Sequence, residues 1–249
     1  PPPRQSLPAV TAPVTLNAGG RPALLAALPL VQGDGQPYGV LAEILQAEPR
    51  GGAAALRQLA GLLEKQALFR SGPGGVLLIT SAEDGEGKSL ATAALAATFC
   101  HYQRSVLILD CHTTAPGLHR YYPGSERHSS AAASLSQLRY GQSHLYVMPA
   151  HDVPAHDTSR LLDGYRAWMD RARREVDWII LDGPSILKNF TDVAPLAPLA
   201  TDVLVVHDPH RASPAQLRAA MTLLQPMMSA TALRGLLHNR HTATTSAPA

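Results

Sequence analysis

The sequence predicts an α/β fold in which a parallel sheet has helices packed on both of its faces. Short apolar runs, rich in branched residues, alternate along the chain with segments of helical character. The runs are apolar at consecutive positions, as strands buried on both faces of a parallel sheet are. A chain of 249 residues, of which 45% are hydrophobic, is long enough for one such domain with terminal extensions.

A single domain is expected over residues 22–240. Residues 1–21 are rich in proline, alanine and glycine, so we expect a disordered lead, either a free N-terminus or a linker. Residues 241–249 are expected to form a disordered polar tail. The net charge of +2 and the scattered basic residues give no indication of a nucleic-acid surface. The chain shows no membrane-span or signal-peptide pattern, and its two cysteines lack ligand spacing, which favours a reducing compartment.

Six apolar runs are predicted as buried strands, and residues 24–28 as a short edge strand before them. The six runs cover residues 76–80, 105–110, 145–149, 178–182, 202–207 and 233–239. Helices are predicted at residues 53–69, from 88 onward, over part of 131–138, and at 159–174 and 213–228. A short helix interrupted by prolines is predicted at 191–199, and a further short helix is an option at 38–47. The last of the long helices begins with Ser213 as N-cap and Pro214 in its first turn.

The stretch from Val76 to Ala97 has the layout of a phosphate-binding loop. An apolar strand leads into a glycine-bearing turn, and a lysine and a serine follow at the start of a helix. Backbone N–H groups of such a turn and of the helix N-terminus attract phosphate, the lysine adds a full charge, and the serine hydroxyl can bind Mg²⁺. The candidate cofactor-binding residues of the loop are Gly85, Glu86, Gly87, Lys88, Ser89 and Leu90.

Two strand-terminal aspartates are expected at the same edge of the sheet as this loop. Asp110 ends the second buried strand and Asp182 the fourth, and ligands of open parallel sheets bind beyond the carboxyl ends of the strands. One carboxylate could hold a metal ion, and the other could accept a proton during phosphoryl transfer. The candidate catalytic residues are Lys88, Asp110 and Asp182, and the candidate metal ligands are Ser89, Asp110 and Asp182.

The loop residues and the two aspartates could instead have ordinary structural roles. Ala82 stands at the first glycine of the common pattern G-x-x-x-x-G-K-[ST], so the stretch could be a plain strand–turn–helix with a surface lysine. An aspartate at the end of a strand could equally cap a helix or form a turn.

Three motifs carry a resemblance to a known family. Residues 81–89 read SAEDGEGKS, residues 110–119 read DCHTTAPGLH and residues 182–185 read DGPS. They resemble S-x-x-P-G-E-G-K-[ST], D-x-D-L-R-x-P-x-L-H and D-x-P-P of the bacterial tyrosine kinases (BY-kinases) of capsule and exopolysaccharide export, which are deviant P-loop ATPases. The resemblance covers roughly residues 22–240.

The resemblance implies a function for the whole site. It implies binding of ATP or ADP with Mg²⁺, and it makes Asn239, in the closing strand, the candidate for contact with adenine. It also implies a membrane polysaccharide co-polymerase as partner, and a cytoplasmic protein that is peripheral at the inner membrane through that partner. If the chain is an active enzyme, the resemblance implies an ATP-dependent protein-tyrosine kinase or ATPase.

Departures from the family's patterns point to kinase activity that is weak or lost. In the loop, Asp84 replaces proline, and in the second motif His112 replaces the second aspartate and Thr114 the arginine. A neutral imidazole is a poor Mg²⁺ ligand. Of the family's ring-forming pattern E-x-x-R-x-x-R only Arg57 remains, so a homo-oligomeric ring is in doubt. The last tyrosine is Tyr165, so the family's C-terminal tyrosine cluster is missing.

Two other functions remain open. One is a non-catalytic nucleotide-binding module, or pseudokinase, that uses the nucleotide as a structural or switching ligand. The other is a positioning ATPase like MinD or ParA, which has the same fold. Such ATPases usually carry a second lysine early in the loop, and residues 81–84 contain none.

Overall fold

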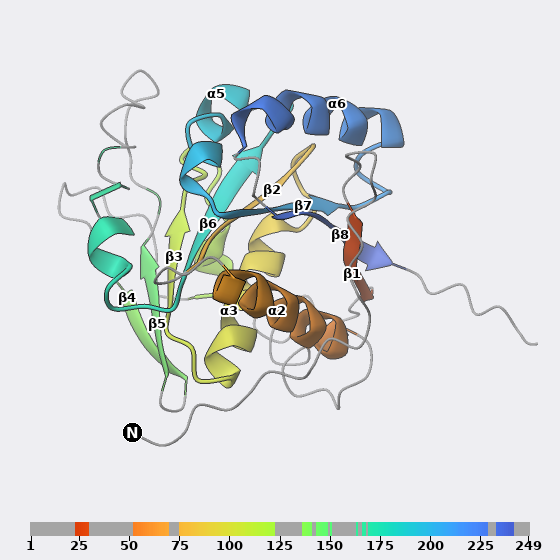
Figure 1. Ribbon diagram of the computed structural model, residues 1–249. Coiled ribbons are helices and arrows are strands. Elements are labelled where there is room, and N and C mark those ends of the chain that lie inside the picture. Colours follow the sequence, from red (N-terminus) through yellow and green to blue (C-terminus); the bar gives the residue numbers. More distant parts are fainter. Residues whose placement is uncertain are drawn as a thin grey trace, which may run out of the picture.

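Figure 1 shows the computed structural model, in which a single eight-stranded sheet has helices on both faces. The residues that the structure describes are 23–29, 52–69, 75–122, 136–140, 143–148, 150, 163, 166–167, 169–228 and 233–241. The expected lead at residues 1–21, the optional helix at 38–47 and all but the first residue of the expected tail lie outside them. None of the described helices combines the length and the apolar character that crossing a bilayer requires.

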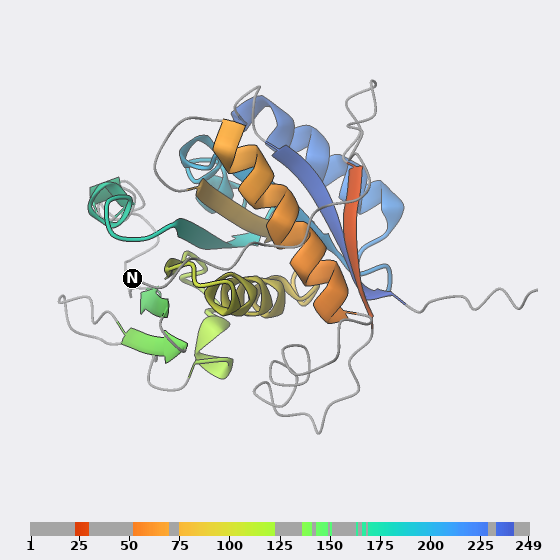
Figure 2. The same cartoon turned by 60° about the horizontal axis from the view of Figure 1, so that its bottom comes forward.

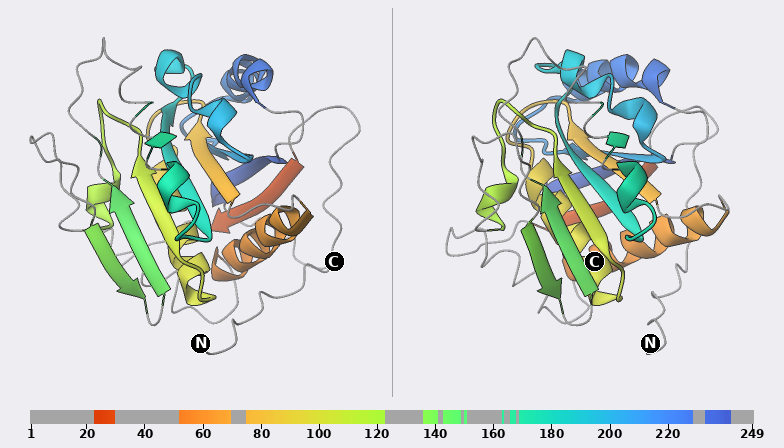
Figure 3. Two further views of the ribbon diagram at one scale, coloured as in Figure 1. Left: turned by 60° about the vertical axis from the view of Figure 1, so that its left-hand side comes forward. Right: turned by 90° about the vertical axis from the view of Figure 1, so that its left-hand side faces the viewer.

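The sheet has the strand order β1-β8-β7-β2-β6-β3-β5-β4. Neighbouring strands are parallel throughout, except that β4 pairs with β5 in the antiparallel sense. Figure 3 shows this order from the β4 edge. The strands are β1 (Ala23–Pro29), β2 (Gly75–Ser81), β3 (Val106–Asp110), β4 (Ser136–Tyr140), β5 (Ser143–Met148), β6 (Trp178–Ser185), β7 (Asp202–His207) and β8 (Leu233–His241).

The four central strands β7, β2, β6 and β3 are buried along their whole length. Burial on both faces explains why their sequences are apolar at consecutive positions rather than at alternate ones. Because these strands are parallel, β2, β6 and β3 all end at one edge of the sheet, where the loop and the two aspartates were expected to meet.

Helices cover both faces of the sheet. On one face, α2 (Gly52–Phe69) and α3 (Lys88–His101) pack in one apolar core, and Figure 2 shows α2 on the β1 side of this face. On the other face, α5 (Phe190–Val193), α6 (Pro214–Leu224) and a helix around residues 166–172 contribute to a second core. The short 3₁₀ segments are η1 (Leu118–Arg120), η2 (Ala197–Leu199) and η3 (Gln225–Met227).

Most of the predicted elements are confirmed. The edge strand and all six buried strands are present, and the predicted N-cap of α6 is confirmed, because the Ser213 hydroxyl accepts a hydrogen bond from the backbone N–H of Gln216. The helix predicted at 159–174 is helical at each described position from 163 to 172.

One prediction needs correction. The helix expected over part of 131–138 does not extend to residues 136–138, which belong to β4 and pair with β5; this cross-strand pairing outweighs the local helix propensity, and residues 131–135 lie outside the described part of the chain. The short, proline-interrupted helix expected at 191–199 is confirmed as α5 and η2, because Pro195 and Pro198 each lack a backbone N–H. In addition, β6 does not end at Asp182 but continues to Ser185.

Candidate nucleotide-binding site

The loop between β2 and α3 turns through two glycines in the left-handed region. Gly85 has a φ of 77° and Gly87 a φ of 97°, which favour a residue without a Cβ. A Cβ on Gly87 would also lie 2.2 Å from Asn239 Nδ2. Gly87 is the N-cap of α3 and leaves that helix without a side-chain cap. The N-terminal N–H groups of α3 therefore face the loop, as anion binding requires.

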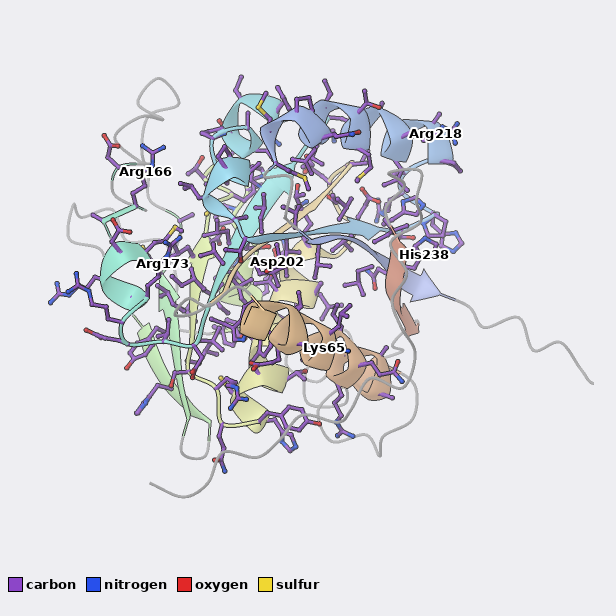
Figure 4. The ribbon with its side chains drawn as sticks, viewed as in Figure 1. Lys65, Arg166, Arg173, Asp202, Arg218 and His238 are labelled. Carbon is purple, nitrogen blue, oxygen red and sulfur yellow. The ribbon has the colours of Figure 1, made fainter. Side chains whose placement is uncertain are left out.

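The buried carboxylate of Glu86 fixes the shape of the loop through hydrogen bonds. Its oxygens accept hydrogen bonds from the backbone N–H groups of Glu83, at 2.6 Å, and Asp208, at 2.9 Å. His207 Nδ1 lies 3.3 Å from the same carboxylate. The ring of His207 in turn meets the ring of His238, which Figure 4 labels on β8, with 5.3 Å between centroids. The side chain of Glu86 therefore supports the shape of the loop, and its backbone is the part directed to a ligand.

The carboxylate of Asp182 joins β6 to the start of α3. The Ser89 hydroxyl donates to Asp182 Oδ2 at 2.7 Å, and the Thr92 hydroxyl donates to Oδ1 at 3.0 Å. Burial raises the pKa of Asp182 to about 6, although both hydroxyls and the positive charge of Lys88 favour the ionised form. Lys88 is also buried, and burial lowers its pKa while Asp182 and Asp84 oppose that shift.

The second motif lies directly beside this carboxylate. Asp110 ends β3 and is in register with Asp182 on β6. The backbone N–H of His112 donates to Asp110 Oδ1 at 3.1 Å, and the N–H of Cys111 donates to the Asp182 carbonyl at 3.0 Å. Burial, aided by the positive charge of Lys88, lowers the pKa of His112 to about 4. The imidazole is therefore neutral at physiological pH.

The structure thus brings the sequence-predicted site residues to one place. Lys88, Ser89, Asp110 and Asp182 meet where β2, β3 and β6 end. Asn239 approaches the loop from β8, and its Nδ2 donates to the carbonyl of Glu86 at 2.9 Å. The segment after β3 also lies against the site, because a Cβ on Gly117 would be 2.5 Å from Ser89 Oγ.

Sequence reasoning missed several residues that contact the loop. Thr92 lies three residues after Ser89, so helical spacing alone would place it on the same face of α3. Lys188 Nζ lies 3.4 Å from Asp84 Oδ2 and 3.6 Å from Glu83 Oε2. No local pattern identifies Lys188, because it is 104 residues from Asp84 in the chain.

The residues of the site fit a bound Mg²⁺. The Ser89 hydroxyl, the Asp182 carboxylate and the neighbouring Asp110 supply hard oxygen atoms, which Mg²⁺ prefers. Over the described residues, no group of three or more His, Cys, Asp or Glu side chains could hold a metal ion by itself. A protein that contributes one or two oxygens, with phosphates and water as the other ligands, is the usual arrangement for Mg²⁺.

We expect Asp182→Asn to raise the unfolding free energy at pH 8 by on the order of 2 kcal/mol, and to change it little near pH 4. The folded-state pKa of about 6 lies above the ordinary value of 3.8 for an aspartate. The stability that the protonated carboxyl contributes is therefore complete below pH 4 and is lost as the pH rises through 6. Urea unfolding of both proteins at the two pH values measures the difference.

The matched control is Asp163→Asn, because Asp163 is exposed and distant from the loop in sequence. A variant Asp182→Asn that is less stable than the unsubstituted protein at pH 8 would show that the ionised carboxylate stabilises the fold.

The chain is similar in sequence to a curated tyrosine kinase. It is 31% identical over 159 residues to a "Putative tyrosine-protein kinase EpsB" of Ralstonia nicotianae, which covers 60% of this chain. The matched part spans 21% of that relative's length, so the chain corresponds to a minor part of it. No protein-family model matches the sequence.

Solved structures show the same fold. The kinase domain of the Escherichia coli tyrosine kinase ETK superposes with a TM-score of 0.69 at 18% identity, covering 91% of this chain and 92% of that domain. The BceF tyrosine kinase domain gives 0.67 at 20% identity, covering 88% and 93%. The resemblance predicted from the sequence motifs is confirmed to this extent: the chain is similar in sequence to a tyrosine kinase of this kind, and it shares the P-loop fold of the BY-kinase domains.

Proposed function

We propose that the chain binds ATP or ADP with Mg²⁺ at the loop formed by residues 81–90. The observation that carries this proposal is the hydrogen bond of 2.7 Å between Ser89 Oγ and Asp182 Oδ2, beside the buried ammonium group of Lys88. These groups put two hard oxygens and one positive charge next to the N-terminus of α3. A Mg²⁺–triphosphate needs these partners.

Each residue of the site has a role in this proposal. Lys88 and the backbone N–H groups of residues 85–90 bind the phosphates, and Ser89 and Asp182 hold Mg²⁺. Asp110 supports the metal through water or accepts a proton from an attacking hydroxyl. Asn239 contacts adenine, since it lies next to Gly87 at the β8 side of the loop. When bound, Mg²⁺ neutralises the charge of the phosphates.

We further propose that the chain regulates exopolysaccharide polymerisation or export with a membrane co-polymerase, at the cytoplasmic face of the inner membrane. The similarity to EpsB and to the kinase domains of ETK and BceF supports this role. The partner follows from the family resemblance of the motifs.

Kinase activity is proposed to be weak or lost, so the nucleotide acts mainly as a switching ligand. The buried imidazole of His112 adds no anionic oxygen beside Asp110, and its low pKa keeps it neutral. The structure gives no specific support for a positioning ATPase, because residues 83 and 84 of the loop are acidic where such proteins usually carry a lysine nearby.

We expect Lys88→Ala to weaken ATP·Mg²⁺ binding by about tenfold to a hundredfold, since a hydrogen bond to a charged group contributes roughly 1.5–3 kcal/mol. Isothermal titration calorimetry measures the change. The control is Lys65→Ala, which removes an exposed lysine on α2 (Figure 4). Equal affinities of the Lys88→Ala variant and the unsubstituted protein would refute phosphate binding at this loop.

We expect no phosphotyrosine above background after the purified chain is incubated with Mg²⁺ and ATP. The physical reason is that His112 stands in place of a carboxylate, so that one anionic oxygen fewer lies beside Asp110. Immunoblotting against phosphotyrosine provides the measurement, with the kinase domain of ETK as the positive control. Strong autophosphorylation of this chain would overturn its assignment as a weak or inactive kinase.

A further inference from the structure

The phosphate-binding loop of this chain carries an unusual carboxylate. Asp84 is exposed over 42% of its side chain, and its Oδ1 lies 3.9 Å from Lys88 Nζ. The other oxygen, Oδ2, lies 3.4 Å from Lys188 Nζ, and the nearby Ser185 hydroxyl helps to lower the pKa of the Asp84 carboxyl. Asp84 is thus shared between the lysine that is proposed to bind phosphate and two residues at the end of β6.

Two departures from the BY-kinase motifs therefore lie near each other. Asp84 stands where the family's loop has proline, and Ser185 stands at the second proline of D-x-P-P. The neighbouring Glu83 is held on the same side, because its carboxylate lies 3.6 Å from Lys188 Nζ and 3.1 Å from the side-chain amide nitrogen of Gln216 on α6. The acidic residues of the loop are thus contacted by Lys188, which follows β6, and by Gln216 on α6.

A carboxylate at this position opposes phosphate binding unless it is neutralised. It repels the negatively charged phosphates and competes with them for the ammonium group of Lys88. Asp84 is ionised at neutral pH: partial burial raises its pKa, but the Ser185 hydrogen bond and the charges of the two lysines hold the pKa below its ordinary value. Over the described residues, Lys188 is the cation that contacts both Glu83 and Asp84.

We propose that Lys188 is a positioning residue for nucleotide binding, which shares the Asp84 carboxylate with Lys88 and thereby keeps Asp84 from closing fully onto Lys88. This inference rests on the proposed function, because it assumes that the loop receives the phosphates of a nucleotide. Lys188 acts through Asp84 and not by direct contact with phosphate. Its removal leaves the Asp84 carboxylate to Lys88, so that the existing contact of 3.9 Å shortens and Asp84 occupies the place of a phosphate oxygen.

A double-substitution cycle with Asp84 tests this mechanism. The dissociation constant of ATP·Mg²⁺ is measured at fixed ionic strength for the unsubstituted chain, Lys188→Ala, Asp84→Asn and the double variant. We expect Lys188→Ala to weaken binding by on the order of threefold to tenfold, Asp84→Asn not to weaken it, and the double variant to bind like Asp84→Asn within about twofold. Lys188→Arg should retain the affinity of the unsubstituted chain.

Matched controls separate this effect from a general loss of charge or fold. Lys65→Ala removes another exposed lysine, on α2, and should not alter the affinity. Thermal unfolding of Lys188→Ala should match that of the unsubstituted chain within about 2 °C, because an exposed ion pair contributes little to stability.

Two results would overturn the inference. One is an equal loss of affinity on Lys188→Ala in the Asp84→Asn background, which would show that Lys188 meets the phosphate directly. The other is an unchanged affinity of Lys188→Ala in the background that retains Asp84. In both cases the chain still binds nucleotide, so the proposed function stands and only the role of Lys188 is refuted. If the unsubstituted chain binds no nucleotide at all, both the proposed function and this inference are refuted.

Discussion

The site depends on one buried carboxylate that joins the sheet to the first turn of α3. Asp182 accepts hydrogen bonds from Ser89 and Thr92, and thereby fixes how the N-terminus of α3 lies against the end of β6. Burial of a carboxylate is costly, as its raised pKa shows, and its hydroxyl partners and the charge of Lys88 reduce that cost only in part. The fold thus tolerates an unfavourable group at a position where a metal–phosphate would neutralise it.

A second buried carboxylate gives the loop its shape. Glu86 binds the backbone N–H groups of Glu83 and Asp208, while Asn239 binds the carbonyl of Glu86. The loop is therefore tied to the ends of β7 and β8 before any ligand arrives. Preorganised N–H groups favour anion binding because little ordering remains to be done.

The sequence predicts the parts of the fold that are locally encoded. The central strands are buried on both faces and so read as apolar runs, and Ser213 with Pro214 marks the start of α6. It does not predict β4, because Ser136–Tyr140 is a polar edge strand whose structure depends on pairing with β5. Pairing between segments that are far apart in the chain is not encoded in the local sequence, so local patterns do not predict it.

In the candidate site, too, some features are encoded in the local sequence and others depend on contacts between distant segments. Lys88 and Ser89 follow from the loop pattern, and the two aspartates follow from the ends of parallel strands. The inward direction of the Glu86 side chain is not encoded locally, since its partner Asp208 is 122 residues away. Likewise, the contact of Lys188 with Asp84 depends on β6 lying beside β2.

The loop at the end of β2 is proposed to receive the phosphates of a nucleotide. Amide hydrogen exchange of the full chain, with and without saturating ATP·Mg²⁺, locates the binding site most directly. We expect exchange to slow at residues 85–92, where N–H groups of the loop and of the start of α3 would bind phosphate oxygens. Slowed exchange elsewhere in the chain, with residues 85–92 unaffected, would contradict this account.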